Sequence, residues 1–235
     1  MKPKTSAAVV QFAIATLAML LWTGVAAAAG TGAPRIAPPG SNAFGKSLTE
    51  WTGIYWRWYY GTASDPAQSM VGNVKLMPLP AGELISGTGT PDDPALYRGQ
   101  LEITLRPGTP FVLPLAAWVA ERYNNGTPDD PMAPNDVFLD GVDPSFYIDG
   151  KPVVTEANKA AFYVTPTPFD PIVVYPAPSS YGSIAALAYQ GYAIVSPPLA
   201  VGRHVIHLYE PYIIRTPFSF GTIYDNTWIV TVSPH

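Results

Sequence analysis

The sequence predicts a mainly β fold: an antiparallel β-sandwich, of which a jelly roll is one form, with one aromatic-rich helix near the N-terminus. The first observation is composition, because the 235 residues include 27 Pro and 20 Gly, which interrupt long helices. The second is a series of short apolar runs between clusters of Pro, Gly, Asp and Asn, a pattern typical of strands joined by turns. The third is that only one stretch has helical periodicity.

The first 29 residues have the pattern of a signal peptide. Lys2 and Lys4 form a basic start, residues 7–24 are almost wholly apolar, and small residues occupy 26–30. Signal peptidase accepts small residues at this place, so we expect cleavage near residue 29 and a secreted or periplasmic protein. An uncleaved anchor is the alternative, since roughly 20 apolar residues are enough to span a bilayer.

After the predicted signal peptide the chain divides into two parts. Residues 30–45 consist largely of Gly, Ala, Pro and Ser, which predicts a flexible N-terminal arm. Residues 46–235 show no break in composition, so we expect a single β-sandwich domain.

The predicted helix spans Leu48 to Tyr60. Ser47 and Glu50 have the spacing of a capping box, in which the serine hydroxyl accepts a hydrogen bond from an unpaired amide and the glutamate reaches back. Gly61 follows the last periodic residue and can adopt the left-handed conformation that closes a helix.

Six aromatic residues lie within ten positions of this helix, more than one face can hold. Trp51, Tyr55 and Trp58 share a face, which we expect to lie on a sheet. Trp56 and Tyr60 point elsewhere and, with Arg57, form the candidate ligand-binding residues, because flat aromatic faces stack on sugars and a guanidinium adds a cation–π contact. The alternative is that the arm and loops bury this second face.

The strands are predicted after the helix. Alternation is clearest in Leu101–Leu105, where Glu102 and Thr104 face away from the apolar residues. The candidates are Gly72–Met77, Gly99–Leu105, Thr109–Trp118, Ser145–Ile148, Ala161–Thr165, Ile172–Tyr175, Ile184–Val195, Gly202–Tyr209 and Trp228–Val232.

Four motifs carry a resemblance to a known family. They are Ser47–Trp58, with a glutamate, a tryptophan and then an arginine among tryptophans; Pro107–Leu115; Ile148–Lys151; and Leu199–His207. Together they resemble a family of secreted bacterial β-sandwich proteins that have a Trp-rich N-terminal helix and no assigned function. Relatives often carry one or two Cys, whereas this chain has none. The resemblance implies export and a sandwich fold, and it implies no catalytic residue.

Metal binding has two candidate regions. His204 and His207 are three apart on a predicted strand and therefore point to opposite faces, while Glu210 shares the face of His204. Calcium, which takes six to eight oxygen ligands, is a possible cofactor of an acidic stretch without EF-hand spacing; Asp turns are the alternative reading. The stretch comprises Asp129, Asp130, Asp136, Asp140, Asp143 and Asp149. We predict no metal site and no other cofactor.

Catalytic signatures are absent from the sequence. It has no Cys, no Gly-x-Ser-x-Gly, no His-Glu-x-x-His and no dinucleotide or phosphate loop. A glycosidase needs two carboxylates across a cleft, and sequence alone does not pair the glutamates. Glu102 and Glu121 lie beside apolar strands and would have raised pKa values if half-buried. The six glutamates are Glu50, Glu83, Glu102, Glu121, Glu156 and Glu210.

The sequence thus favours an exported bacterial binding protein without catalytic activity, with a polysaccharide as one candidate ligand. The alternatives are a polysaccharide-active enzyme with a Glu/Asp acid–base pair and a structural or assembly protein of the envelope. The net charge of −4 argues against nucleic acid, which requires a basic surface. We expect an extracellular glycan or protein partner and no membrane contact after signal cleavage; the oligomeric state stays open.

Overall fold

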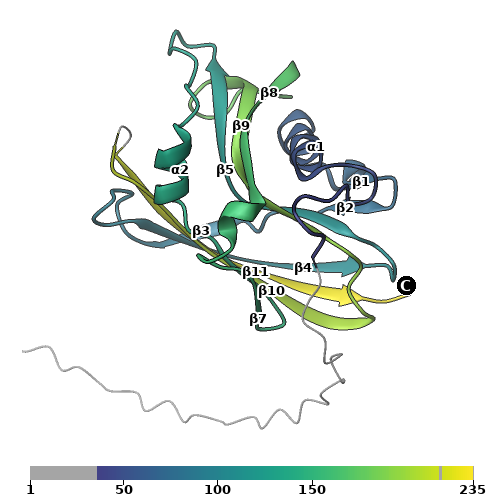
Figure 1. The fold of residues 1–235 in the computed structure, drawn as a ribbon. Coiled ribbons are helices and arrows are strands. Elements are labelled where there is room, and N and C mark those ends of the chain that lie inside the picture. The colour runs from purple at the N-terminus through teal and green to yellow at the C-terminus, as the bar shows by residue number, and fades with distance from the viewer. Residues whose placement is uncertain (1–35, 217–218, 235) are drawn as a thin grey trace, which may run out of the picture. The chain divides into compact units, whose positions relative to one another are not determined.

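The fold is described by a computed structural model over residues 36–216 and 219–234, all within one compact unit, Gly32–His235. The predicted signal peptide, residues 1–29, and the start of the predicted arm lie outside the described residues. Two β-sheets and an N-terminal helix make up most of the structure (Figure 1), so the prediction of a mainly β fold with one aromatic-rich N-terminal helix is confirmed.

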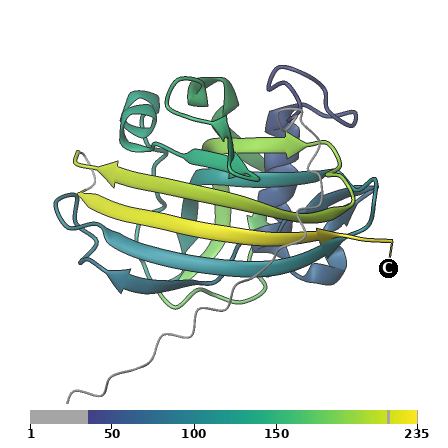
Figure 2. The ribbon, with the colours of Figure 1, turned by 90° about the horizontal axis from the view of Figure 1, so that it is seen from below.

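The first sheet has five strands. In spatial order they are β1 (Met70–Val71), β2 (Val74–Leu76), β5 (Phe111–Tyr123), β9 (Ser183–Ser196) and β8 (Tyr163–Val174). The second sheet has six strands, and its long strands lie side by side in Figure 2. Their order is β3 (Gly82–Ser86), β4 (Ala95–Leu105), β11 (Phe220–Val232), β10 (Gly202–Ile214), β6 (Ser145–Ile148) and β7 (Lys151–Val154).

Both sheets are mixed, which corrects the purely antiparallel arrangement of the prediction. β4 pairs with β11 in parallel along its whole length, and β2 pairs with β5 in parallel. More than a hundred residues of sequence separate β4 from β11, so no hairpin turn forces them to be antiparallel. Strand periodicity identifies a strand but carries no information about the direction of its neighbour.

Short helices connect the strands. The second α-helix, α2 (Asn135–Gly141), was not predicted, and it buries Phe138. Single 3-10 turns occupy Pro66–Gln68 and Lys159–Phe162.

The main core lies between the two sheets. β5 and β9 contribute Leu113 and Ile194, and β10 and β11 contribute Ile206 and Trp228, all fully buried. The Trp228 indole donates a hydrogen bond to the carbonyl of Pro78, so its polar edge is also satisfied.

Helix α1 (Leu48–Gly61) packs on the five-stranded sheet, against β5, β8 and β9. The predicted capping box is present: the Glu50 amide donates to Ser47 Oγ at 3.2 Å, and the Ser47 amide donates to the Glu50 carboxylate at 2.8 Å. Trp51, Tyr55 and Trp58 are buried in a second apolar cluster with residues of the sheet, as predicted.

The end of α1 corrects the prediction for Gly61. Gly61 is the last helical residue, and the left-handed conformations fall on Ala63 and Ser64, with φ of 50° and 52°. The helix is closed by Thr62, whose amide donates to the Trp58 carbonyl. A Cβ on Gly61 would lie 3.2 Å from Val173 Cγ1, so glycine serves here for close approach of the helix to β8.

Part of the predicted flexible arm is held against the sheet. The amide of Ala37 donates to the carbonyl of Val195 in β9 at 2.8 Å. The Trp51 indole donates to the carbonyl of Ala43 at 2.7 Å. Residues 36–45 are therefore hydrogen-bonded both to β9 and to the first turn of α1.

Several strands extend beyond their predicted bounds. The candidates Ala161–Thr165 and Ile172–Tyr175 overlap the two ends of a single strand, β8 (Tyr163–Val174), which carries three prolines at positions 166, 168 and 171. β8 lies at the edge of its sheet and pairs only with β9, and an edge strand tolerates missing amide donors. The edge strand β3 is exposed along its whole length, so it carries no alternation by which it could be predicted.

Candidate functional site

The free edge of β5 is where the candidate site begins. β2 is short and pairs with β5 only at Phe111 and Val112. β5 continues to Tyr123, and beyond Val112 β9 is its only neighbouring strand within the described sheet. Pro114 lies just past this point and has no amide to offer a further strand. The middle of β5 is therefore bordered by side chains on its second edge.

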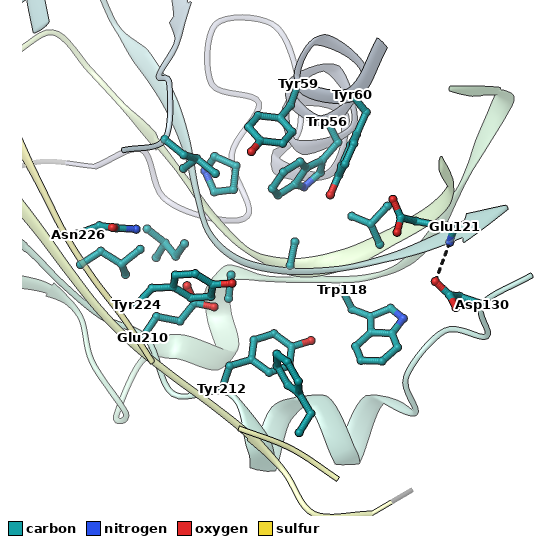
Figure 3. Close-up of a pocket in the computed structure, with 18 of the residues that line it drawn as sticks. Trp56, Tyr59, Tyr60, Trp118, Glu121, Asp130, Glu210, Tyr212, Tyr224 and Asn226 are labelled. Carbon is teal, nitrogen blue, oxygen red and sulfur yellow. Dashed lines mark hydrogen bonds between the residues drawn. The ribbon is translucent and has the colours of Figure 1, made fainter. Parts of the chain in front are cut away.

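A cavity of about 740 Å³ lies along this edge. α1 lines one side of it, β5 passes through the middle, and β10 and β11 line the opposite side (Figure 3). Its volume falls in the range of about 300–1,000 Å³ typical of small-molecule sites. Eight of its twenty lining residues are aromatic: Trp56, Tyr59, Tyr60, Trp118, Tyr181, Tyr212, Phe220 and Tyr224.

Three aromatic side chains of α1 form one wall. Trp56 packs edge-on against Tyr59, with ring centroids 5.5 Å apart, and lies 5.7 Å from the Tyr60 ring. Tyr60 stacks on Tyr175 of the region after β8, with ring centroids 5.1 Å apart. This stack fixes the Tyr60 ring. Its burial raises the pKa of the Tyr60 hydroxyl far above 10, so the hydroxyl stays protonated.

The opposite wall is built on the inward face of β10 and β11. Glu210 and Tyr212 are two residues apart on β10 and therefore share a face. Tyr224 on β11 is the direct cross-strand partner of Glu210, and Asn226 is the partner of Leu208. The pleat and the register together place a carboxyl group between two tyrosine rings.

Glu210 is the most unusual group of the site. Its side chain is buried, and among the described residues it makes no hydrogen bond or ion pair. Burial alone raises the pKa of the Glu210 carboxyl well above its ordinary value of 4.5, because a carboxylate loses its hydration in apolar surroundings. Burial, followed by the negative charge of the neighbouring Glu210, raises the pKa of the Tyr224 hydroxyl to about 12.

Two further carboxyl groups line the far end of the cavity in better-satisfied surroundings. The Glu121 carboxylate accepts hydrogen bonds from the hydroxyls of Tyr175 and Ser183. Asp130 accepts a hydrogen bond from the Tyr123 hydroxyl at 2.8 Å and one from the Glu121 amide at 3.3 Å (Figure 3). The cavity is thus lined by one buried carboxyl without a hydrogen bond in the described structure, that of Glu210, and by two hydrogen-bonded carboxyl groups, those of Glu121 and Asp130.

Three polar groups in the cavity wall also lack a protein partner among the described residues. They are the indole N–H of Trp56, the hydroxyl of Tyr212 and the side-chain oxygen of Asn226. A buried polar atom without a partner costs about 1–3 kcal/mol, and most such atoms in proteins are satisfied. These three groups belong to residues that line the cavity, as Glu210 does; the other buried polar groups without a partner in the described structure are the Gln190 amide and the Tyr192 hydroxyl.

The structure separates the sequence-predicted candidate residues. Trp56 and Tyr60 line the cavity together. Arg57 instead donates to the carbonyls of Asp170 and Pro171, at 2.9 and 2.8 Å, and its guanidinium lies 5.2 Å from the Phe169 ring centroid. Arg57 thus attaches α1 to β8 and does not line the cavity.

The histidines and aspartates of the metal hypotheses have other contacts. His204 Nδ1 lies 2.7 Å from Asp149, and His207 Nε2 lies 2.8 Å from Asp225. Asp143 contacts the buried Lys159. In residues 36–216 and 219–234, no three His, Cys, Asp or Glu side chains are grouped so that they could hold a metal ion.

Glu210 was missed by the sequence-based choice of site residues, although a signal for it exists. In β10 the buried residues Ile206 and Leu208 are even-numbered, and continuing by twos leads to Glu210, Tyr212 and Ile214. A charged residue in phase with a buried face is the signal. Glu102 is exposed on β4, so of the two glutamates expected beside apolar strands only Glu121 reaches the cavity.

No known protein family, no curated protein and no solved structure matches this chain. The fold and the cavity define it as a mainly β protein with an aromatic-lined, acidic inner site. None of the helices in the described part of the chain has the length and apolar character to span a membrane.

Proposed function

We propose that this protein is an exported binding protein without catalytic activity, which takes a small molecule or the terminal group of a glycan into the cavity between α1, β5, β10 and β11. The observation that carries the proposal is the set of polar groups without partners around an aromatic cavity of about 740 Å³. A natural protein keeps such groups where something else satisfies them.

The chemistry of the wall supports a ligand with both flat and polar parts. Aromatic rings offer large apolar faces with polar edges, which suit sugar rings and other cyclic molecules. The Trp56 N–H donates, Asn226 Oδ1 accepts, and the Tyr212 hydroxyl does both. Each hydrogen bond to a ligand would satisfy a group that the protein leaves unpaired.

Export and family membership belong to the same proposal. The basic start, apolar stretch and small residues before residue 30 support removal of a signal peptide. The motifs in α1 and in the β6–β7 hairpin support a place in the family of secreted bacterial β-sandwich proteins. Asp149 and Gly150 both have positive φ in that hairpin, as its tight turn requires.

A thermal-shift screen of the mature chain against oligosaccharides, wall fragments and small cyclic molecules tests the proposal. A ligand of the folded state raises the midpoint by several degrees when present at about a hundred times its Kd. Trp56→Phe removes the unpaired indole N–H in the cavity and should weaken binding about tenfold.

Trp58→Phe is the matched control for this experiment. It changes the same residue type on the same helix, but Trp58 donates to the Asp65 carbonyl and does not line the cavity. We expect it to lower the midpoint of the free protein and to leave the ligand-induced shift unchanged. Equal effects of the two variants on binding would contradict the placement of the site.

A polysaccharide-active enzyme is the second candidate, favoured by one specific observation. Glu210 lies in apolar surroundings that raise its pKa, while the Glu121 carboxylate accepts two hydrogen bonds. Two carboxyl groups in contrasting environments are the arrangement of an acid and a base. Release of product from a bound glycan, lost in Glu210→Gln while binding persists, would support this candidate. Binding without turnover would exclude it.

A further inference from the structure

The charges that line the cavity are of one sign. Glu121, Asp130 and Glu210 contribute carboxyl groups, and no Lys, Arg or His of the described chain lines the wall. An anionic ligand would meet only repulsion there. The cavity therefore favours a neutral or positively charged occupant.

The surroundings of Glu210 favour a positively charged occupant over a neutral one. Glu121 and Asp130 have hydrogen-bond donors in the protein, so their negative charge is already stabilised. Glu210 has no donor among the described residues, yet it is buried beside Tyr212 and opposite Tyr224. A lone buried carboxyl needs either a proton or a counter-ion.

The surroundings of Glu210 fit a particular kind of counter-ion. The tyrosine rings on each side offer aromatic faces, and Trp56 and Tyr59 lie across the cavity from them (Figure 3). Aromatic faces attract organic cations that have lost part of their hydration. A carboxylate within such a group of rings is the usual recognition chemistry for an ammonium group.

We propose that the ligand of this cavity carries an organic ammonium group, which pairs with Glu210 next to the rings of Tyr212 and Tyr224. The inference rests on the proposed function, since it takes the cavity to be a binding site. It adds the ligand class, an organic cation, and the residue that selects it.

Proton exchange follows from this pairing. In the free protein Glu210 carries a proton at a pH where an ordinary glutamate has lost it. The bound cation replaces that proton, which leaves for the buffer. The groups that face Glu210 are Tyr212 on its own strand and Tyr224 and Asn226 on β11. Burial raises the pKa of both tyrosines, so they keep their protons and Glu210 is the group that exchanges.

Isothermal titration calorimetry of the mature chain with charged and neutral ligand pairs tests the proposal. The pairs are choline with its carbon analogue, in which tert-butyl replaces trimethylammonium, and phenethylamine with phenethyl alcohol. We expect at least one cation to bind about tenfold more tightly than its neutral partner. Repeating the titration in buffers of different ionisation enthalpy should show release of up to one proton per site.

Glu210→Gln and Glu102→Gln are the variant and its control. The first keeps the shape of the side chain and removes its charge, so it should abolish both the preference for the cation and the proton release. The second changes an exposed glutamate on β4 and should alter neither. The wild-type comparison of charged and neutral ligands needs no variant, so it holds even if Glu210→Gln fails to fold.

The outcomes separate the two proposals. Equal affinity for cations and their neutral analogues, or cation binding that Glu210→Gln leaves unchanged, would overturn the ammonium inference while leaving the cavity as a binding site. If Trp56→Phe alters the binding of no ligand in the wider screen and no cation binds, both proposals fail. A cation preference that requires Glu210 and releases a proton would support both.

Discussion

The two faces of α1 both carry buried aromatic side chains, but they differ in whether the polar atoms of these side chains have hydrogen-bond partners. Towards the sheet, the polar atoms of the aromatic residues all have acceptors: Trp51 donates to the Ala43 carbonyl, Tyr55 to that of Met77 and Trp58 to that of Asp65. Towards the cavity, the indole N–H of Trp56 has no partner in the described structure. Residue type and helix are the same, so the two faces differ in whether the buried indole N–H has a hydrogen-bond acceptor in the described structure.

The same contrast extends to the strands beneath. Tyr189 on β9 donates to the Thr49 carbonyl of α1 at 2.8 Å, which fastens the helix to the sheet. Tyr212 on β10 is also buried, but its hydroxyl has no partner among the described residues. Unpaired polar groups thus occur on the cavity side, beside Glu210, and also on β9, where the Gln190 amide and the Tyr192 hydroxyl have no partner in the described structure.

The largest difference between the two regions should appear on truncation of the tryptophans. Trp51→Ala removes a fully buried side chain and its hydrogen bond, and we expect the free energy of unfolding to fall by about 3–5 kcal/mol. Trp56→Ala widens a cavity that already exists and breaks no hydrogen bond, so its loss should be clearly smaller. Urea denaturation of both variants measures the difference, and equal losses would break the comparison.

The next largest effect concerns Glu210 and pH. The pKa of Glu210 is raised in the folded protein above its unfolded value near 4.5, so the folded state binds the proton more tightly. Stability therefore falls as pH rises from the unfolded pKa to the folded pKa, by up to about 1.4 kcal/mol per pH unit.

Glu210→Gln should remove this part of the pH dependence. The variant should gain stability relative to the wild type as pH increases from about 4 to 8, as measured by denaturation at several pH values. Glu102→Gln serves as the exposed control. A Glu210→Gln profile parallel to that of the wild type would show that the carboxyl is stabilised by a partner.

The smallest effect, and the sharpest test, compares two buried tyrosines. Tyr55→Phe leaves the Met77 carbonyl without its donor, and we expect a loss of about 1–3 kcal/mol. Tyr212→Phe removes a hydroxyl that has no partner, so stability should stay unchanged or rise slightly. Thermal and urea denaturation of the pair decide this, and a comparable loss in both would mean that Tyr212 is satisfied within the protein.

Local features were predictable because their causes are local. The start of α1 depends on the capping box of Ser47 and Glu50, three residues apart. The buried face of the helix follows from the spacing of Trp51, Tyr55 and Trp58, which the structure confirms. The strand at 145–148 and its Asp149-Gly150 turn were recognised from alternation and turn residues alone.

Errors arose where a distant neighbour decides the local conformation. Gly61 was expected to close α1 in a left-handed conformation, but it is the last helical residue, where a Cβ would lie only 3.2 Å from Val173 Cγ1. The two segments of β8 were separated at its prolines, because only the sheet order shows that β8 is an edge strand. The parallel pairing of β4 with β11 joins segments that no sequence period relates.

By itself, the sequence determined the class of fold, the aromatic helix with its cap, and two residues of the candidate site, Trp56 and Tyr60. These follow from propensity and periodicity over a few residues. Only the tertiary structure decided that the Arg57 guanidinium donates hydrogen bonds to backbone carbonyls of β8 and that Glu210 lines the same cavity as Trp56. The physical reason is that burial and hydrogen-bond pairing depend on the neighbours that folding supplies, and here those neighbours lie more than a hundred residues apart.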